Sequence, residues 1–313
     1  MDIAIDPTDL HYCSVQSLSK DEPLFGSAPE TYLWLILEYQ HPPGDNALKE
    51  SNLPEEVKAH LSTLQKSIAN SRLLLVRNQM TSVKDSHSFF IAYANRVNPC
   101  LYEIQISDYR ELLSIDQTAI LGETFVLPNR RVNERLILIC TNGKRDPCCI
   151  KWGLPTFNAV TSESGVFVMQ TSHVGGHRFA ANMVCLPHGI YYGRVSPDDA
   201  IAIVRNYQDG NIYLKNYRGR AIYPAIAQAA DFYLRDQTNE MRLDVYQLES
   251  MMDLGAGNWD VIFSNKFSGK INRLQMATEL SVQTIYESCS TPDELKPIKK
   301  YRLIQSSIED SSG

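Results

Sequence analysis

Two stretches of this chain carry the same order of predicted elements: strand, helix, three strands, helix. In the first stretch, the apolar run TYLWLILEY at 31–39 predicts a buried strand. An amphipathic pattern at 53–70 predicts the helix, with Asn52 as its cap and Pro54 in its first turn. The remaining elements are predicted as strands at 72–78, 88–95 and 100–106, followed by a short helix at 107–115. One crossover helix followed by a hairpin is the order of a thioredoxin-like α/β domain.

The second stretch repeats this order. Its elements are predicted as a strand at 135–140, a helix at 150–164, a strand at 165–171, a strand pair around His188-Gly189 and a helix at 196–208. Ser196 and Pro197 suit the N-cap and the first position of that last helix. The two stretches share almost no sequence identity, so a duplication is a hypothesis that depends on element order alone.

Length and charge exclude several classes of protein. The chain has 313 residues, 43% of them apolar, which is enough for two domains with a core in each. A formal net charge of −6 gives no basic surface for a nucleic-acid backbone. The apolar run at 32–39 is too short to span a bilayer, and the acidic start MDIAIDPTDL is unlike a signal peptide. We therefore expect a cytoplasmic protein that binds neither nucleic acid nor membrane.

Two loops collect candidate metal ligands. CTNGKRDPCC at 140–149 lies between a predicted strand and helix, and HVGGH at 173–177 begins where the next strand ends. Gly-Gly disfavours a helix, so we expect HVGGH to be a tight loop with positive φ at Gly175 and Gly176. Parallel strands joined by one crossover helix end at the same sheet edge. Two cysteines and two histidines are thus predicted to converge.

Two cofactors suit such a donor set. Structural zinc sites usually take cysteines two to four residues apart, whereas eight residues separate Cys140 from Cys149. The wider loop favours a [2Fe–2S] cluster with two thiolates on one iron and two imidazoles on the other, as in Rieske-type ligation. The alternative is a zinc-stabilised Cys2His2 interaction module without redox function. A thiol oxidoreductase that uses Cys148 and Cys149 is a third hypothesis, disfavoured because such enzymes need Cys-x-x-Cys.

Three segments resemble the sucrase/ferredoxin-like family. They are CSVQSLSKDEPLFGSAPETYLWLILEY, CTNGKRDPCC and SHVGGHRFAANMVCLPHGIYYGRV. The resemblance implies a thioredoxin-like ferredoxin domain in the C-terminal half, with a [2Fe–2S] cluster held by two cysteines and two histidines as in the fungal actin-patch-distribution branch. Carried over by position, the ligands are Cys140, Cys149, His173 and His177. The adjacent Cys148 keeps the choice of the second cysteine open, and Asn142 stands where related sequences often carry histidine.

The resemblance completes the domain and function predictions. We predict a thioredoxin-like domain without a cluster at 1–130, a thioredoxin-like ferredoxin domain at 131–235, and a small β-rich appendage with a tail at 236–313. A linker is expected near 127–134, and a hairpin within 259–277. The function predicted is electron transfer, with proton-coupled reduction, by a carrier rather than an enzyme with its own substrate. Without a G-x-G-x-x-G fingerprint for a nicotinamide or flavin site, its redox partner must be a separate protein, and the chain is expected to be a monomer or weak dimer.

Other residues have less specific expectations. Cys13 is expected in a loop packed on the first domain, Cys148 as a buried thiol beside the cluster, and Cys185 in the core. Arg178 directly follows His177, where it could raise the reduction potential, meet an acidic partner or face solvent. His188 is expected at the surface or in a turn. The last residues, 307–313, are expected to be disordered.

Overall fold

The computed structural model describes residues 7–77, 86–94, 98–115, 118, 120, 131–161, 163 and 166–310. Its helices are η1 (Pro7–Asp9), α1 (Cys13–Ser19), α2 (Glu55–Ser67), η2 (Tyr109–Ser114), α4 (Pro147–Val160), η3 (His177–Phe179), α5 (Pro197–Gln208), η4 (Leu214–Asn216) and α6 (Ala225–Thr238). Its strands are β1 (Leu33–Glu38), β2 (Ser71–Arg77), β3 (His87–Tyr93), β4 (Cys100–Ile106), β5 (Arg131–Val132), β6 (Arg135–Cys140), β7 (Val166–Thr171), β8 (Met183–Leu186), β9 (Ile190–Tyr192), β10 (Tyr217–Arg220), β11 (Tyr246–Gly255), β12 (Asn258–Asn265), β13 (Ile271–Tyr286) and β14 (Leu295–Glu309).

Within the described residues, β1 to β10 form one ten-stranded sheet, in the order β10-β9-β8-β6-β7-β2-β1-β3-β4-β5. In the first half β1 pairs parallel with β2 and antiparallel with β3, which pairs with β4. In the second half β6 pairs in the same way with β7 and β8, and β8 pairs with β9. The two halves thus share one topology, as the element order predicts, and β2 joins them by pairing antiparallel with β7.

The sequence predicts two tandem domains divided by a linker, whereas the strands of both halves form one continuous sheet. Val132, inside the predicted linker, lies in β5 and pairs with Leu101 of the first half. Residues 127–130 of that linker lie outside the described residues, as do residues 78, 95, 162, 164 and 165 of the predicted elements. The domain limits at 130 and 235 stay predictions. The mixed α/β class and the β-rich C-terminal sheet, β11-β12-β13-β14, are confirmed.

Several predicted boundaries shift for local reasons. Helix α2 begins at Glu55, and Pro54, with an extended ψ of 140°, is its N-cap in place of Asn52. Proline disfavours helical backbone angles in the residue before it, so Leu53 stays outside the helix. The element that closes the first half is a 3-10 helix, η2, capped by Asp108. Helix α4 begins three residues before the predicted position 150, at Pro147. The expected disorder of residues 307–313 is wrong for 307–309, since strand β14 extends to Glu309 and pairs with β13, while residues 311–313 lie outside the described residues.

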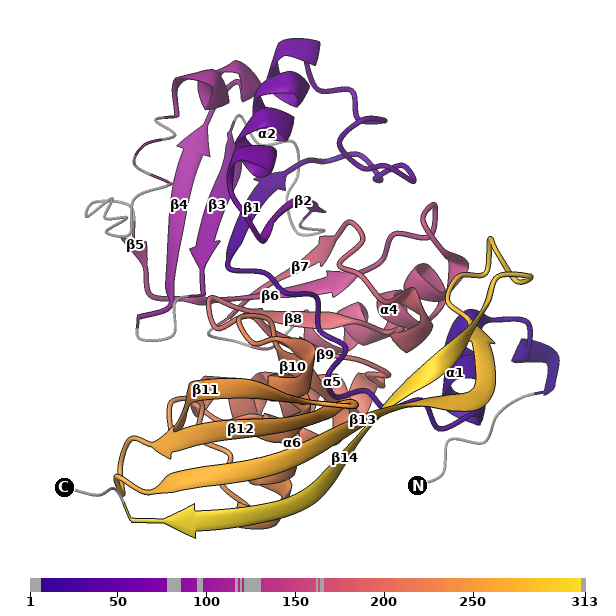
Figure 1. The fold of residues 1–313 in the computed structure, drawn as a ribbon. Helices are drawn as coiled ribbons and strands as arrows, with labels where there is room; N and C mark the ends of the chain where they lie inside the picture. The colour runs from indigo at the N-terminus through magenta and orange to yellow at the C-terminus, as the bar shows by residue number, and fades with distance from the viewer. Residues whose placement is uncertain are drawn as a thin grey trace.

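Helices cover both faces of the ten-stranded sheet. One face packs on α2 in the first half and on α4 and α5 in the second, through alternate apolar residues of the strands. The opposite face packs on α6, which lies between the large sheet and the four-stranded sheet (Figure 1). Cys185 on β8 is fully buried, which confirms its predicted place in the core. Among the described residues, no helix combines the length and the apolar character that a bilayer crossing requires.

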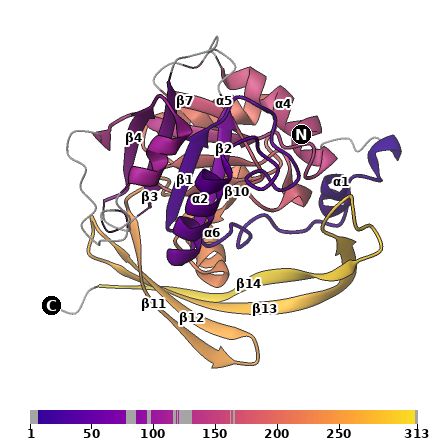
Figure 2. The ribbon, with the colours of Figure 1, turned by 90° about the horizontal axis from the view of Figure 1, so that it is seen from above.

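The N-terminal segment packs on the second half of the sheet, where the tip of the β13–β14 hairpin also lies (Figures 1 and 2). The Trp152 indole of α4 donates a hydrogen bond of 2.9 Å to Ser14 of α1. Cys13 is the first residue of α1 and lies within 3.5 Å of Cys148 on α4, sulfur to sulfur. The expectation of a loop packed on the first domain is therefore wrong for Cys13. Apolar contacts with α4 and the hairpin hold this segment in place.

Candidate metal centre

The parallel pair β6–β7 brings the two candidate loops together. Cys140, the last residue of β6, is in register with Thr171, the last residue of β7. The CTNGKRDPCC loop and the HVGGH loop therefore leave the sheet at the same edge, as the crossover predicts. Asn142 anchors the first loop, because its side chain donates to the Gly44 carbonyl at 3.0 Å.

Helix α4 presents Cys149 to Cys140 because of how the helix starts. The Asp146 carboxylate caps it by accepting from the backbone N–H of Cys148 at 2.9 Å, and Pro147 occupies the first turn. Gly153 lies one turn further along, against β6. A Cβ at Gly153 would overlap the carbonyl oxygen of Cys140 and lie 3.1 Å from its carbonyl carbon. The helix thus approaches the strand more closely than any residue with a side chain allows.

Three of the four predicted ligands form one tight group. The ligand atoms of Cys140, Cys149 and His173 all lie within 4.8 Å of one another. Nδ1 of His173 is 3.8 Å from the sulfur of Cys149. Both cysteines are buried, while His173 is half-buried. The geometry therefore places Cys149, rather than Cys148, with Cys140 and His173.

His177 lies next to this group rather than within it. Its ring centroid is 5.0 Å from that of His173. Its Nδ1 faces the Asp146 carboxylate at 3.7 Å, is buried, and has no hydrogen-bond partner within the described residues. Burial lowers the pKa of His177, and the Asp146 carboxylate opposes that shift. The imidazole is thus neutral at pH 7, which is the form that binds a metal.

The two thiols are electrostatically coupled. A hydrogen bond from the Cys149 side chain lowers the pKa of Cys140 well below that of an ordinary thiol, and His173 reinforces this against the effect of burial. The same hydrogen bond raises the pKa of Cys149, as does burial. These contacts favour the thiolate form of Cys140, and thiolate is the form of cysteine that ligates metals.

Three side chains hold the HVGGH loop by its backbone carbonyls. Arg72 donates to the carbonyl of Val174, Arg218 to that of Gly175 at 3.0 Å, and Asn182 to that of Gly176 at 2.9 Å. The loop is tight as predicted, with φ of 97° at Gly175 and 72° at Gly176. These contacts fix the chain on both sides of His173 and His177.

Arg218 is a site residue that the sequence did not reveal. It lies on β10 with only 1% of its surface exposed, and it also donates to the hydroxyl and carbonyl of Ser27 at 3.0 and 2.6 Å. Burial lowers the pKa of Arg218 to about 9, so the guanidinium stays charged at neutral pH. The sequence gives no signal of this role, because an arginine near a strand end is usually exposed.

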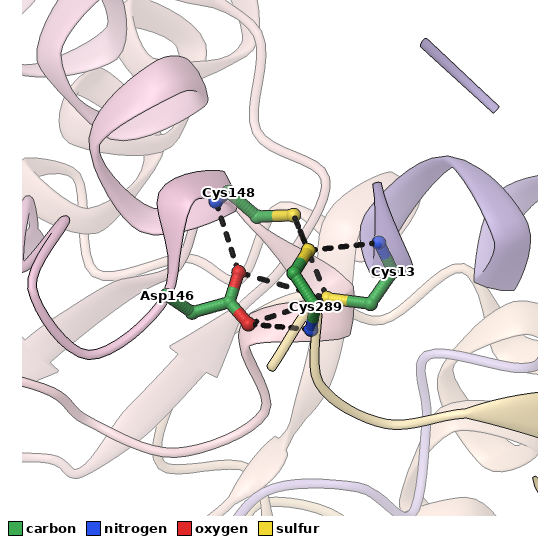
Figure 3. A group of neighbouring side chains, drawn as sticks. All are labelled: Cys13, Asp146, Cys148 and Cys289. Carbon is green, nitrogen blue, oxygen red and sulfur yellow. Dashed lines mark hydrogen bonds between the residues drawn. The ribbon is translucent and has the colours of Figure 1, made fainter. Parts of the chain in front are cut away.

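Arg178 and Cys148 have partners outside the ligand group. Arg178 pairs with Glu22 at 2.8 Å and with Glu287 at 2.9 Å, so the expectation of an acidic partner is confirmed. Cys148 is fully buried, as predicted. It belongs to a second cluster of side chains with Cys13, Cys289 and Asp146 (Figure 3).

The fold and this donor set are compatible with an iron–sulfur protein. The chain belongs to the sucrase/ferredoxin-like family, whose model matches residues 24–219. It is similar to the Altered inheritance of mitochondria protein 32 of Meyerozyma guilliermondii, with 36% identity over 99 residues, covering 28% of this chain and 35% of that protein. The protein of the same name from Debaryomyces hansenii is 34% identical over 99 residues, covering 28% and 36%. The chain thus spans only about a third of the length of these curated relatives.

A solved structure also resembles part of the chain. It is a cysteine-to-serine variant of the thioredoxin-like [2Fe–2S] ferredoxin from Aquifex aeolicus, with 18% identity and a TM-score of 0.26. The likeness covers 28% of this chain and 99% of the ferredoxin.

Proposed function

We propose that this protein is an electron carrier with a [2Fe–2S] cluster held by Cys140, Cys149, His173 and His177. The observation that supports this proposal best is the convergence of two buried thiols and two imidazoles from two loops at one sheet edge. The unpartnered, buried Nδ1 of a neutral His177 fits a histidine whose environment is completed by a ligand. The cluster, when bound, would accept and release one electron.

Two features of the chain favour a mild rather than a strongly negative reduction potential. Neutral imidazoles in place of two anionic thiolates raise the potential, as in Rieske centres at about −150 to +300 mV, compared with about −400 mV for plant-type ferredoxins. The buried charge of Arg218, held against the loop that carries both histidines, stabilises the electron-rich reduced state further. We therefore expect an electron acceptor rather than a low-potential reductant.

The two histidines differ in their access to protons. His177 is buried beside Asp146, whereas His173 lines an open surface depression of about 790 Å³. We expect His173 to take up the proton when the cluster is reduced. The midpoint potential should then fall by about 59 mV per pH unit where one proton accompanies one electron. A potential that stays constant from pH 6 to 10 would refute the proton coupling.

The same depression is where a redox partner would approach the cluster. Its walls come from both halves of the sheet, since helix α2 and the preceding loop face the edge that carries His173. Four of its lining residues are cationic and two are acidic: Lys49, Lys58, Lys66 and Arg145, and Asp45 and Glu55. The excess of positive over negative side chains in the depression contrasts with the net charge of −6 for the whole chain, and it favours a partner with an acidic contact surface.

Zinc is the second candidate for this centre. The three donor atoms within 4.8 Å of one another could also surround one tetrahedral ion with Zn–S bonds of about 2.3 Å. In that case the protein would be an interaction module without redox function. The compartment also stays a prediction, because the sequence predicts the cytoplasm while the name of the relatives refers to mitochondria.

Alanine variants test the ligand assignment. We expect Cys140→Ala, Cys149→Ala, His173→Ala and His177→Ala each to lose the iron and visible absorbance of the purified protein. Cys148→Ala should retain both, because Cys148 lies in the second cluster of side chains. Cys100→Ala is the control, since Cys100 lies in strand β4 of the first half and in neither group. Loss of iron in Cys148→Ala and its retention in Cys149→Ala would contradict the assignment.

A further inference from the structure

Three cysteines and a carboxylate from distant parts of the chain meet outside the candidate metal centre (Figure 3). Cys13 begins α1, Asp146 and Cys148 lie at the start of α4, and Cys289 lies between β13 and β14. Their ligand atoms all lie within 4.8 Å of one another. The sulfur of Cys148 is 3.5 Å from that of Cys13 and 3.4 Å from that of Cys289.

These distances suit a single tetrahedral ion. With Zn–S bonds of about 2.3 Å, the sulfurs around a tetrahedral zinc lie about 3.8 Å apart. The Asp146 oxygens, each 3.8 Å from the sulfur of Cys13, complete a set of three sulfurs and one oxygen. The sulfurs are too far apart for a disulfide, whose S–S bond is about 2.05 Å long. The group is a set of free thiols.

The surroundings of this group favour negative charge. Cys13, Cys148 and the Asp146 side chain are buried, with 0% exposure for both cysteines. Backbone N–H groups of Cys148 and Cys289 donate to Asp146, each at 2.9 Å, and that of Cys13 donates to the sulfur of Cys289 at 3.2 Å. Nδ1 of His177 lies 3.7 Å from the Asp146 carboxylate, beyond hydrogen-bond distance, and no lysine or arginine pairs with Asp146 within the described residues. A buried carboxylate without a lysine or arginine partner favours a bound cation.

We propose that Cys13, Cys148, Cys289 and Asp146 bind one Zn²⁺ ion in a structural site that is separate from the iron–sulfur centre. Binding forms three Zn–S bonds and one Zn–O bond, releases to solvent the protons that the cysteines still carry, and transfers no electron. Zinc suits this donor set because it takes Cys sulfur and Asp oxygen in four-coordinate structural sites. The alternative, a disulfide between two of the three cysteines, would need an oxidant.

A zinc ion at this site would link three segments that lie far apart in the sequence. It joins the N-terminal helix and the tip of the C-terminal hairpin to the first turn of α4, the helix that also carries Cys149. Arg178 makes a parallel connection, because Glu22 follows α1 and Glu287 lies in the hairpin tip. Asp146 would touch both sites, since its carboxylate faces His177 as well as the three thiols.

Metal analysis of the 313-residue chain, purified anaerobically without chelators from zinc-supplemented cells, tests this proposal. We expect one zinc per chain that is lost in Cys289→Ser and in Cys13→Ser, while iron and visible absorbance are retained. His173→Ala should show the opposite pattern, with iron lost and this zinc kept. The iron content therefore tests the cluster assignment, and the zinc content tests the zinc site independently of it. Cys100→Ser is the matched control and should keep both metals. Zinc that is absent from the wild type, or that persists in both cysteine variants, would overturn the proposal.

Thiol labelling of the wild type gives a test that needs no variant. With zinc bound, the half-buried Cys289 should resist a maleimide until a strong chelator is added, whereas the fully buried Cys13 and Cys148 should resist it in both states. Labelling of the half-buried Cys289 at the same rate before and after chelation would overturn the proposal. So would a disulfide among the three cysteines, found by mass spectrometry of the anaerobic protein.

Discussion

Replacing Gly153 by alanine tests whether the close approach of α4 to β6 sets the spacing of the two cysteine ligands. The new Cβ would overlap the Cys140 carbonyl oxygen and lie 3.1 Å from the carbonyl carbon. Carbon atoms in van der Waals contact are about 3.5–4.0 Å apart, so the contact with the carbonyl carbon alone requires the helix to retreat by about 0.5–1 Å, and the overlap with the oxygen requires no less. The obstacle is backbone in a central strand, which cannot rotate away as a side chain can. Cys149 moves with the helix while Cys140 stays on the strand.

We expect Gly153→Ala to lower the iron content of the protein more than its free energy of unfolding. Overpacking costs about 1–3 kcal/mol, and the higher helix propensity of alanine offsets about 1 kcal/mol of that cost. The free energy of unfolding should therefore fall by at most about 2 kcal/mol. A metal site requires its ligands to within about 0.5 Å, so the same shift should remove much of the bound iron.

The assay is iron content and visible absorbance of Gly153→Ala, together with its urea unfolding curve. Asn158→Ala, on the exposed face of the same helix, is the matched control and should change neither by more than a minor amount. Full iron content and unchanged absorbance in Gly153→Ala would refute the reasoning, because the helix would then adjust without separating the cysteines.

Two further predictions concern residues outside the ligand group. Burial lowers the pKa of His188 to about 3, and its imidazole is hydrogen-bonded to the Tyr207 hydroxyl at 2.7 Å. Below about pH 6.5 the histidine binds a proton in the unfolded state but not in the folded state. The free energy of unfolding therefore decreases as the pH falls from 6.5 toward 3. Between pH 7 and pH 5 the wild type should lose about 2 kcal/mol more than His188→Asn, as measured by unfolding, and equal losses would contradict this. Arg218→Lys keeps the charge but loses the planar fork that contacts Gly175 and Asn182, so unfolding should become easier by about 2 kcal/mol and iron content should fall. Unchanged stability and iron content would show that Arg218 does not hold the loop.

The sequence predicts the elements of both halves well because their apolar patterns are strong and their caps are local. Ser196 and Pro197 start α5 as expected, since a capping side chain and a fixed φ act within one turn. Helix α4 starts three residues before the predicted position 150, because Asp146 caps it and Pro147 takes its first position, whereas the sequence pattern predicts both in the loop. Where β2 pairs with β7 could not be predicted, since the pattern of an edge strand does not identify its partner.

The candidate site was predictable only where it depends on strands that are close in sequence. One crossover determines that the loops after β6 and β7 meet, so Cys140, Cys149 and His173 could be grouped from their spacing. The second cluster could not be foreseen, because Cys13 and Cys289 are 276 residues apart and meet through the length and curvature of the β13–β14 hairpin. Nothing local in either segment encodes that contact.

The measurement that tests the central claim most directly is the low-temperature EPR spectrum of the anaerobically purified, dithionite-reduced protein, recorded with its iron, sulfide and zinc content. Our account predicts two irons and two sulfides per chain, and a reduced signal whose average g-value lies below that of all-cysteine clusters. A colourless protein that carries zinc at Cys140, Cys149 and the two histidines, and that takes up no cluster on reconstitution, would contradict it.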